Sequence, residues 1–473
     1  MDALSDAIDA EDISTIETLV QDPDIDVNAL INGANVLHYA SANGYERVVE
    51  LLLARPDIQV NIQSEDGYTP LIHSLLENKH SIVQLLLAHP GIDVNLRDNE
   101  GETALHVAIN TIKDFNYFSV SLLLAFPGID VNIQDNRGNT PLHYACMDNL
   151  KYIVEKLLTF PEINVNLQNN ELCTALMYAE DDGSNLLAMP GIALDIVDED
   201  GRTALIQAVE YANLPKVKML ISRGANVNIR SNRGETALLR ACEIRFQDPT
   251  PFIEAILSRP IDDINYGRSG YNALIRISLT PNSYALRLLL SQKNIDINHK
   301  DERGKTPLMR ACQGEQVENV RILLSFPGID VNLKDVLGRT ALGMALEENN
   351  PEIIRMLIGK GAKYYLKDVI RYYPEFKELN TLIKLYKGDI YEEGVQTRYK
   401  RQRVENQQAN TQIATTMDIY AMQVLDDLIR SLRLQIPSSI DTSHNFQEVL
   451  RYIKTYYYDP IRDEEGNETF RLI

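Results

Sequence analysis

Apolar residues recur along the first 360 residues of the chain with two superimposed spacings. Locally they stand at positions i, i+3 and i+4, as in Val49, Leu52 and Leu53, which is typical of a helix that buries one stripe. Over longer distances, one leucine of the pattern returns every 29 to 37 residues. It occurs at Leu4, Leu37, Leu71, Leu105, Leu142, Leu176, Leu205, Leu238, Leu274, Leu308 and Leu342. Periods of this size predict a solenoid of eleven stacked units.

Each unit contains signals for two helices and a turn. Thr-Pro pairs such as Thr69-Pro70 and Thr140-Pro141 predict the start of a short first helix, because Thr caps the helix and Pro fits its first position. The heptapeptide FPGIDVN, at 126–132 and again at 326–332, ends the second helix. Its Pro cannot continue a helix and its Gly accepts a left-handed conformation, so an extended segment and a DxxG turn are predicted to follow.

These motifs resemble those of the ankyrin-repeat family over roughly residues 1–366. GNTPLHYAC (138–146) and RGANVN (223–228) are similar to the family's TPLHxA and G-A-D-V-N phrases. The resemblance implies an all-α solenoid of helix-turn-helix repeats with β-turn fingers. Residues 1–31 are then an N-terminal capping repeat and residues 32–366 the remaining repeats. The unit at 177–191 is five residues shorter between its helices, which predicts shortened helices there.

The period ends after Gly361. We expect capping helices at 367–388, a polar linker at 389–411 and a helical C-terminal module with an acidic tail at 412–473. Lys400, Arg401 and Arg403 in the linker resemble a short nuclear-import signal, with a solvated basic patch as the alternative. For the tail itself, DEEGNETFRLI, a disordered segment or a small hairpin is the simple interpretation.

Charge favours some partners over others. Residues 1–362 carry 30 Lys and Arg against 50 Asp and Glu, which is −20 of the total net charge of −21. Such an excess disfavours broad binding to nucleic acid or to anionic membranes and favours basic protein partners. No run of 18 apolar residues is present, so we expect no membrane insertion. The expected location is the cytoplasm, with the nucleus or a host cytosol as alternatives, and the expected state is a monomer.

Candidate chemistry is sparse. Cys146, Cys242 and Cys312 share one repeat position and read as small packing residues. His38, His106 and His143 occupy the LHxA position, and the resemblance implies that they join turns by hydrogen bonds. The sequence contains no phosphate-binding glycine loop, kinase signature or HExxH motif. We therefore expect no catalytic, cofactor-binding or metal-ligating residue, with an unrecognised activity in 389–473 as an alternative.

The resemblance implies protein binding through the groove and the turn tips. The groove candidates lie two residues after the repeat leucine and are Tyr39, His73, Tyr144, Tyr178, Arg240, Arg276 and Arg310. If they face the groove, the arginines suit an acidic or phosphorylated peptide, while the alternative is that they neutralise neighbouring carboxylates. The turn-tip candidates are Glu65, Asp66, Tyr68, Asn99, Glu100, Arg137, Glu199, Asp200 and Arg233.

Three further resemblances extend this scaffold hypothesis. Glu464, Glu465, Glu468 and Phe470 resemble the acidic C-terminal signal of type IV secreted bacterial effectors, which redirect host proteins. The segment IPSSI (436–440) faintly resembles a ubiquitin-ligase adaptor box. The surroundings of four asparagines are similar to the sites that eukaryotic asparaginyl hydroxylase modifies in ankyrin repeats. These asparagines are Asn95, Asn132, Asn298 and Asn332.

Overall fold

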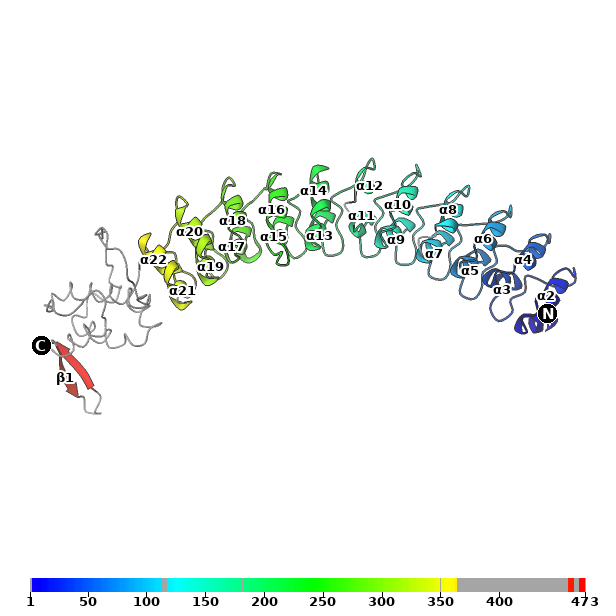
Figure 1. The fold of residues 1–473 in the computed structure, drawn as a ribbon, viewed down its shortest axis with the longest axis horizontal. Coiled ribbons are helices and arrows are strands. Elements are labelled where there is room, and N and C mark those ends of the chain that lie inside the picture. The colour runs from blue at the N-terminus through cyan, green and yellow to red at the C-terminus, as the bar shows by residue number, and fades with distance from the viewer. Residues whose placement is uncertain are drawn as a thin grey trace, which may run out of the picture. The chain divides into compact units, whose positions relative to one another are not determined.

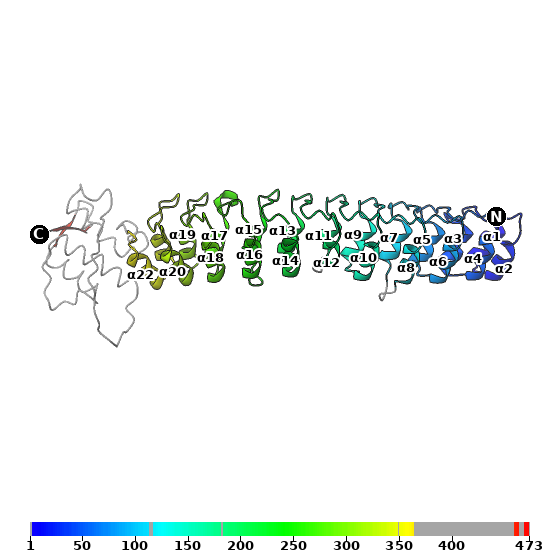
Figure 2. The same cartoon turned by 90° about the horizontal axis from the view of Figure 1, so that it is seen from above.

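The fold was analysed in a computed structural model that describes residues 2–112, 117–180, 183–348 and 350–363, together with two strands near the C-terminus. These residues form two compact units. The first unit comprises residues 1–244 and 255–260, and the second comprises 245–254 and 261–473. Each unit is built from antiparallel helix pairs, and the first helices of neighbouring pairs lie side by side in one row while the second helices lie in another (Figures 1 and 2).

The first unit begins with seven helix pairs, and helices α15 and α16 form the next pair, of which α16 belongs partly to each unit. The helices are α1 (Asp2–Asp9), α2 (Ile13–Leu19), α3 (Val36–Asn43), α4 (Glu46–Leu53), α5 (Pro70–Leu76), α6 (His80–Leu87), α7 (Ala104–Asn110), α8 (Phe118–Leu124), α9 (Pro141–Met147), α10 (Lys151–Leu157), α11 (Ala175–Tyr178), α12 (Ser184–Leu187), α13 (Ala204–Glu210), α14 (Leu214–Ser222), α15 (Ala237–Ala241) and α16 (Thr250–Leu257).

The second unit continues the pattern with three more pairs. Its helices are η1 (Arg268–Gly270), α17 (Ala273–Ser278), α18 (Ser283–Leu290), α19 (Pro307–Gln313), α20 (Val317–Ser325), α21 (Ala341–Glu347) and α22 (Pro351–Gly359). The described part of the chain therefore contains eleven α-helical pairs, as the eleven leucines predict. This confirms the all-α solenoid.

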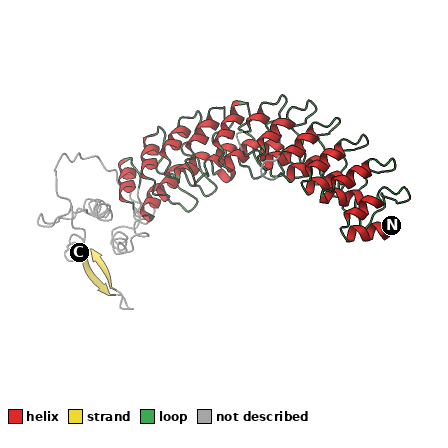
Figure 3. Cartoon of the chain, turned by 45° about the vertical axis from the view of Figure 1, so that its right-hand side comes forward, coloured by secondary structure: helices red, strands yellow, loops and turns green. Residues whose placement is uncertain are grey.

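Strands occur near the C-terminus, where a helical module was expected. β1 (Tyr458–Arg462) pairs antiparallel with β2 (Glu468–Leu472), with Tyr458 opposite Leu472 and Arg462 opposite Glu468 (Figure 3). Tyr, Ile, Thr and Phe in these segments favour strands, and this preference explains the difference from the helical expectation. The pairing agrees with the hairpin interpretation of the tail. The remainder of 367–473, including the expected capping helices, linker and IPSSI segment, lies outside the described residues.

Caps and buried stripes explain why each pair forms. Thr69, Thr140 and Thr306 each accept a hydrogen bond from a backbone N–H of the first turn. In the second helices, Val49 and Leu52 are fully buried, and their counterparts in the later repeats, such as Val83, Leu86, Val320 and Leu323, are buried as well. The third position of the stripe is half-buried in the early repeats, as at Leu53, and buried in later ones, as at Leu290 and Leu324.

Asparagines of the xVN segments tie each repeat to the next. Asn95 Nδ2 donates to the Gly128 carbonyl at 2.9 Å, and Asn95 Oδ1 accepts from the Asp130 N–H at 2.9 Å. Asn132 makes the same two bonds one repeat later, to Glu162 and Asn164. Thus Nδ2 of each amide donates to the following repeat and Oδ1 accepts from it.

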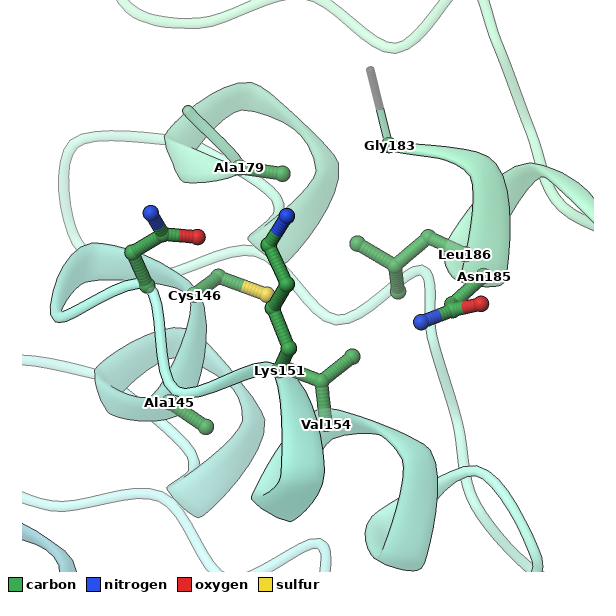
Figure 4. Close-up of a pocket in the computed structure, with 9 residues that line it drawn as sticks. Ala145, Cys146, Lys151, Val154, Ala179, Gly183, Asn185 and Leu186 are labelled. Carbon is green, nitrogen blue, oxygen red and sulfur yellow. The ribbon is translucent and has the colours of Figure 1, made fainter. Parts of the chain in front are cut away.

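The shortened unit has two four-residue helices, α11 and α12, as predicted. A cavity of about 20 Å³, enough for about one water molecule, lies beside them. Cys146, Lys151, Ala179 and Leu186 are among its lining residues (Figure 4). The next repeat supports the short helix α11, because buried Lys216 of α14 donates to the carbonyls of Met177 at 3.2 Å and Ala179 at 2.6 Å.

Candidate functional site

Two groove candidates of the first unit, Tyr144 and Tyr178, are tied to their own fingers. Tyr144 Oη donates to Asp135 Oδ2 at 2.6 Å. Tyr178 Oη accepts from Asn169 Nδ2 at 2.9 Å. In both cases the finger residue precedes the tyrosine by nine positions. Tyr39, His73, Tyr144 and Tyr178 are all half-buried, so part of each ring remains accessible.

The arginine candidates have partners within the chain. In the first unit, Arg240 forms ion pairs with Glu210 and Glu243, both at 2.8 Å. Its side chain is 34% exposed. The interpretation that these guanidinium groups neutralise neighbouring carboxylates therefore describes Arg240 well.

Two arginines of the second unit flank one aromatic ring. Arg276 and Arg310 place their Cζ atoms 5.3 Å and 5.1 Å from the centroid of Tyr271. Arg310 also pairs with Asp301. Arg276 is only 6% exposed, and its Nε donates to the Tyr271 carbonyl at 3.1 Å. Arg276 therefore does not contribute to an exposed row of arginines, because its guanidinium group lies against the Tyr271 ring and its Nε donates to the Tyr271 carbonyl.

A group of carboxylates surrounds Tyr144. Its hydroxyl lies 2.6 Å from Asp135 Oδ2 and 3.2 Å from Glu102 Oε1, although it has one proton to donate. Burial, followed by the nearby charge of Asp98, raises the pKa of Glu102. Burial also raises the pKa of Asp98, with a further contribution from Glu100. Asp98, Glu102 and Asp135 therefore crowd negative charge into a partly buried space, and exposed Glu100 adds its charge nearby.

The turn-tip candidates lie on a connected row within the first unit. Glu65, Asp66, Asn99, Glu100, Arg137, Glu199 and Arg233 are exposed, while Tyr68 and Asp200 are half-buried. Asn136 links successive tips, because its N–H donates to the Glu100 carbonyl at 2.9 Å and its Nδ2 to the Asn99 carbonyl at 2.8 Å. Sequence reasoning missed this linking role, although an Asn that recurs at the tip position was a visible signal.

Glycine is required at the tip formed by Gly138 for two reasons. Gly138 has a φ of 78°, and a Cβ at this position would lie 2.8 Å from the Asn170 N atom. The left-handed conformation and the close approach of the next finger both exclude a side chain. The row of tips is therefore held by backbone geometry as well as by asparagine side chains.

The histidines of the LHxA position are structural. His38, His106 and His143 are buried, and each Nε2 donates to a carbonyl of the next finger: Tyr68 at 2.9 Å, Asn139 at 3.2 Å and Cys173 at 3.1 Å. Burial lowers the pKa of His38 and His106 to about 4 and also lowers that of His143. The resemblance implied that these histidines join turns by hydrogen bonds, and the structure shows these bonds. All four cysteines are buried.

The remaining candidates are placed as follows. Asn95, Asn132, Asn298 and Asn332 are half-buried, and each amide bonds the following repeat, so their hydroxylation stays a prediction. Lys400, Arg401, Arg403, Glu464 and Glu465 lie outside the described residues, and Glu468 and Phe470 lie in β2. Among the described residues no group of His, Cys, Asp and Glu is arranged to hold a metal ion. None of the helices in the described ranges is long and apolar enough to cross a bilayer.

The repeats of this chain are similar to known proteins. A family model described as "Ankyrin repeats (3 copies)" matches residues 4–98, 37–135, 111–188, 182–266 and 274–368. Among solved structures, the chain is similar to the ankyrin repeat domain of Bcl-3, described as a unique member of the IkappaB protein family. The two are 23% identical with a TM-score of 0.36, over 54% of this chain and 98% of the other.

Proposed function

Because this chain belongs to the ankyrin-repeat family, we propose that it is a non-catalytic protein-binding scaffold whose first unit binds a partner with a basic surface. The observation that carries the proposal is the group of carboxylates around Tyr144. No ion pair joins Asp98, Glu100, Glu102 or Asp135 to a Lys or Arg of the described ranges. Arg97, whose charge lowers the pKa of Asp98, donates instead to the Gly101 carbonyl and to Asn136 Oδ1. A cationic side chain from a partner relieves their mutual repulsion, and this gain accompanies binding.

The neighbouring surface supports the same partner chemistry. Glu65, Asp66 and Glu100 are exposed on tips that precede or include this group. The bonds between tips fix their spacing, so little conformational entropy is lost when a partner binds them. The arginines of the second unit support an acidic or phosphorylated partner less well, because Arg276 is buried and Arg310 is paired with Asp301.

A pair of charge-matched variants tests the proposal. We expect Glu100→Gln with Glu102→Gln to weaken binding of the main partner captured from a eukaryotic lysate by about tenfold, because two attractive charges are lost. Glu46→Gln with Glu50→Gln removes the same charge from the exposed face of α4 and should leave binding unchanged. Capture followed by mass spectrometry identifies the partner, and calorimetry at two salt concentrations measures its affinity. Equal affinity for both double variants would contradict the proposal.

The effector alternative depends on the acidic tail, and it stays a prediction. If the protein is translocated into a host, Glu464→Lys with Glu465→Lys should abolish transfer of a fused reporter, because the acidic character of the signal is lost. The substitutions leave the residues of β1 and β2 unchanged. Lys400→Gln with Arg401→Gln serves as a control for transfer and, through nuclear accumulation, as a test of the import patch. Undiminished transfer of the tail variant would exclude this use of the tail.

A further inference from the structure

One buried cation of the second unit lacks a carboxylate partner. Lys305 directly precedes the residue that caps α19, and it is only 5% exposed. No ion pair joins its ammonium group to an Asp or Glu of the described ranges. Its Nζ donates instead to the neutral amide oxygen Oε1 of Gln313 at 2.8 Å. The ammonium group has therefore lost most of its hydration without gaining the opposite charge that normally compensates for that loss.

Two other repeats have an ion-paired arginine at the position of this lysine. Arg202 Nη1 lies 3.3 Å from Glu210 Oε2, and Arg339 Nη1 lies 3.5 Å from Glu347 Oε2. In both repeats the carboxylate follows the cation by eight residues. Gln313 stands at the same separation from its own cation. This repeat therefore keeps the cation but has a neutral amide in place of the carboxylate.

The aspartate of the finger does not supply the missing charge either. In the two repeats with an arginine, an aspartate four residues earlier also pairs with the guanidinium group, at 2.9 Å in each case. The equivalent Asp301 accepts through Oδ1 from the backbone N–H of Lys305 at 2.8 Å, and its Oδ2 pairs with Arg310. The ammonium group of Lys305 is thus without either of the two ion pairs that the equivalent arginines form.

The electrostatic potential at this ammonium group is positive. Burial lowers the pKa of Lys305. The charges of Arg310 and Arg339 lower it further, and together they outweigh the two nearby aspartates, which raise it. A negative charge that reaches this position is therefore attracted by more than one cation.

The side chain of Gln313 gives access to the ammonium group from the surface. Gln313 is exposed, and at the equivalent position of the next repeat the side chain of Glu347 is 29% exposed. The amide oxygen of Gln313 also lies 3.4 Å from Arg310 Nη1. A carboxylate accepts stronger hydrogen bonds from both cationic groups than an amide does, so it is expected to displace this amide.

We propose that the ammonium group of Lys305 binds a side-chain carboxylate of a partner protein, which takes the place of the Gln313 amide. The carboxylate supplies the charge that a glutamate of the same repeat supplies to the equivalent arginines. A phosphate group fits less well, because its second negative charge meets the finger aspartates. This site in the second unit differs from the acidic surface of the first, and the inference rests on the proposed function only in taking the carboxylate from a protein.

Small probes test the chemistry without the partner. We expect N-acetylglutamate methylamide to shift the ¹³Cε resonance of Lys305 saturably in the full chain labelled with ¹³C-Lys, a resonance assigned by its absence from Lys305→Met. The glutamine analogue has the same length but no charge, and it should bind at least about tenfold more weakly. The phosphoserine analogue should bind no more tightly than the glutamate probe. Equal binding of the glutamine and glutamate probes, tighter binding of the phosphoserine probe, or no saturable shift would overturn the proposal.

Two variants at the exposed Gln313 form a matched pair. Gln313→Glu supplies the missing carboxylate from the chain itself, so it should raise the pKa of Lys305 and weaken glutamate-probe binding by about tenfold or more. Gln313→Ala removes the amide without adding charge and should retain the binding. Circular dichroism and urea unfolding check that both variants keep the fold. Undiminished probe binding by Gln313→Glu, or its loss in folded Gln313→Ala, would refute the inference.

The two proposals fail separately. If the glutamate probe binds but no protein is captured, only the proposed function fails. A captured protein without probe binding refutes only this inference.

Discussion

The free energy of unfolding should fall steeply as the pH is lowered from 6.5 toward 4, because the buried histidines must become charged. Burial holds the pKa of His38 and His106 at about 4 in the folded chain, below the ordinary value of 6.5. The unfolded chain therefore binds these protons first. The stabilisation from the neutral rings is complete above pH 6.5 and is lost as the pH falls through this window. At pH 5 the two rings together cost about 4 kcal/mol.

Two carboxyl groups act in the opposite direction. The raised pKa of Asp98 and of Glu102 means that their protonated forms are favoured in the folded chain, so they oppose the loss at the acid end of the window. Urea unfolding at pH 7 and pH 5, with proton uptake measured by calorimetry, gives the net effect. His106→Gln keeps a donor for the Asn139 carbonyl but does not titrate, so its pH dependence should be smaller by about 2 kcal/mol at pH 5. A variant with the same pH dependence as the natural chain would show that His106 is not one of the groups responsible.

Lys216→Met should destabilise the first unit by about 1–3 kcal/mol, the usual cost of leaving buried polar groups without hydrogen bonds. Met retains most of the aliphatic volume, so packing changes little. What is lost is the pair of donors to the carbonyls of Met177 and Ala179 at the end of the four-residue helix α11. The measurement is the urea midpoint, together with amide hydrogen exchange across 175–187.

An exposed lysine of the same helix provides the control. Lys218→Met makes the same chemical change on the solvent side of α14 and should alter stability by no more than about 0.5 kcal/mol. If Lys216→Met and Lys218→Met have equal effects, the buried ammonium does not support the short helix. Faster exchange confined to α11 and α12 would locate the loss in the shortened unit.

Much of the fold could be predicted from the sequence because each repeat carries its own local instructions. Thr69 and Thr140 are capping residues by chemistry alone, and the structure places them at helix starts. The spacing of Val49 and Leu52 marks a buried face without knowledge of the neighbour. The positions of His38 and His106 followed from the family resemblance, since their bonds reach fingers 30 or more residues away.

The candidate site was less predictable. The sequence places Tyr144 and Arg276 at the same repeat position, but it does not determine which side chains they contact. Tyr144 meets two carboxylates, whereas Arg276 is covered by Tyr271.

The sequence by itself determined the period, the helix ends, the eleven pairs and the net charge, because these depend on residue type and on separations of a few residues. Only the tertiary structure decided which polar groups of the stacked repeats are satisfied by their neighbours and which remain unpaired or crowded. The physical reason is that burial and hydrogen bonding across repeats depend on atoms that are 30 or more residues apart in sequence, whose distances no local pattern encodes.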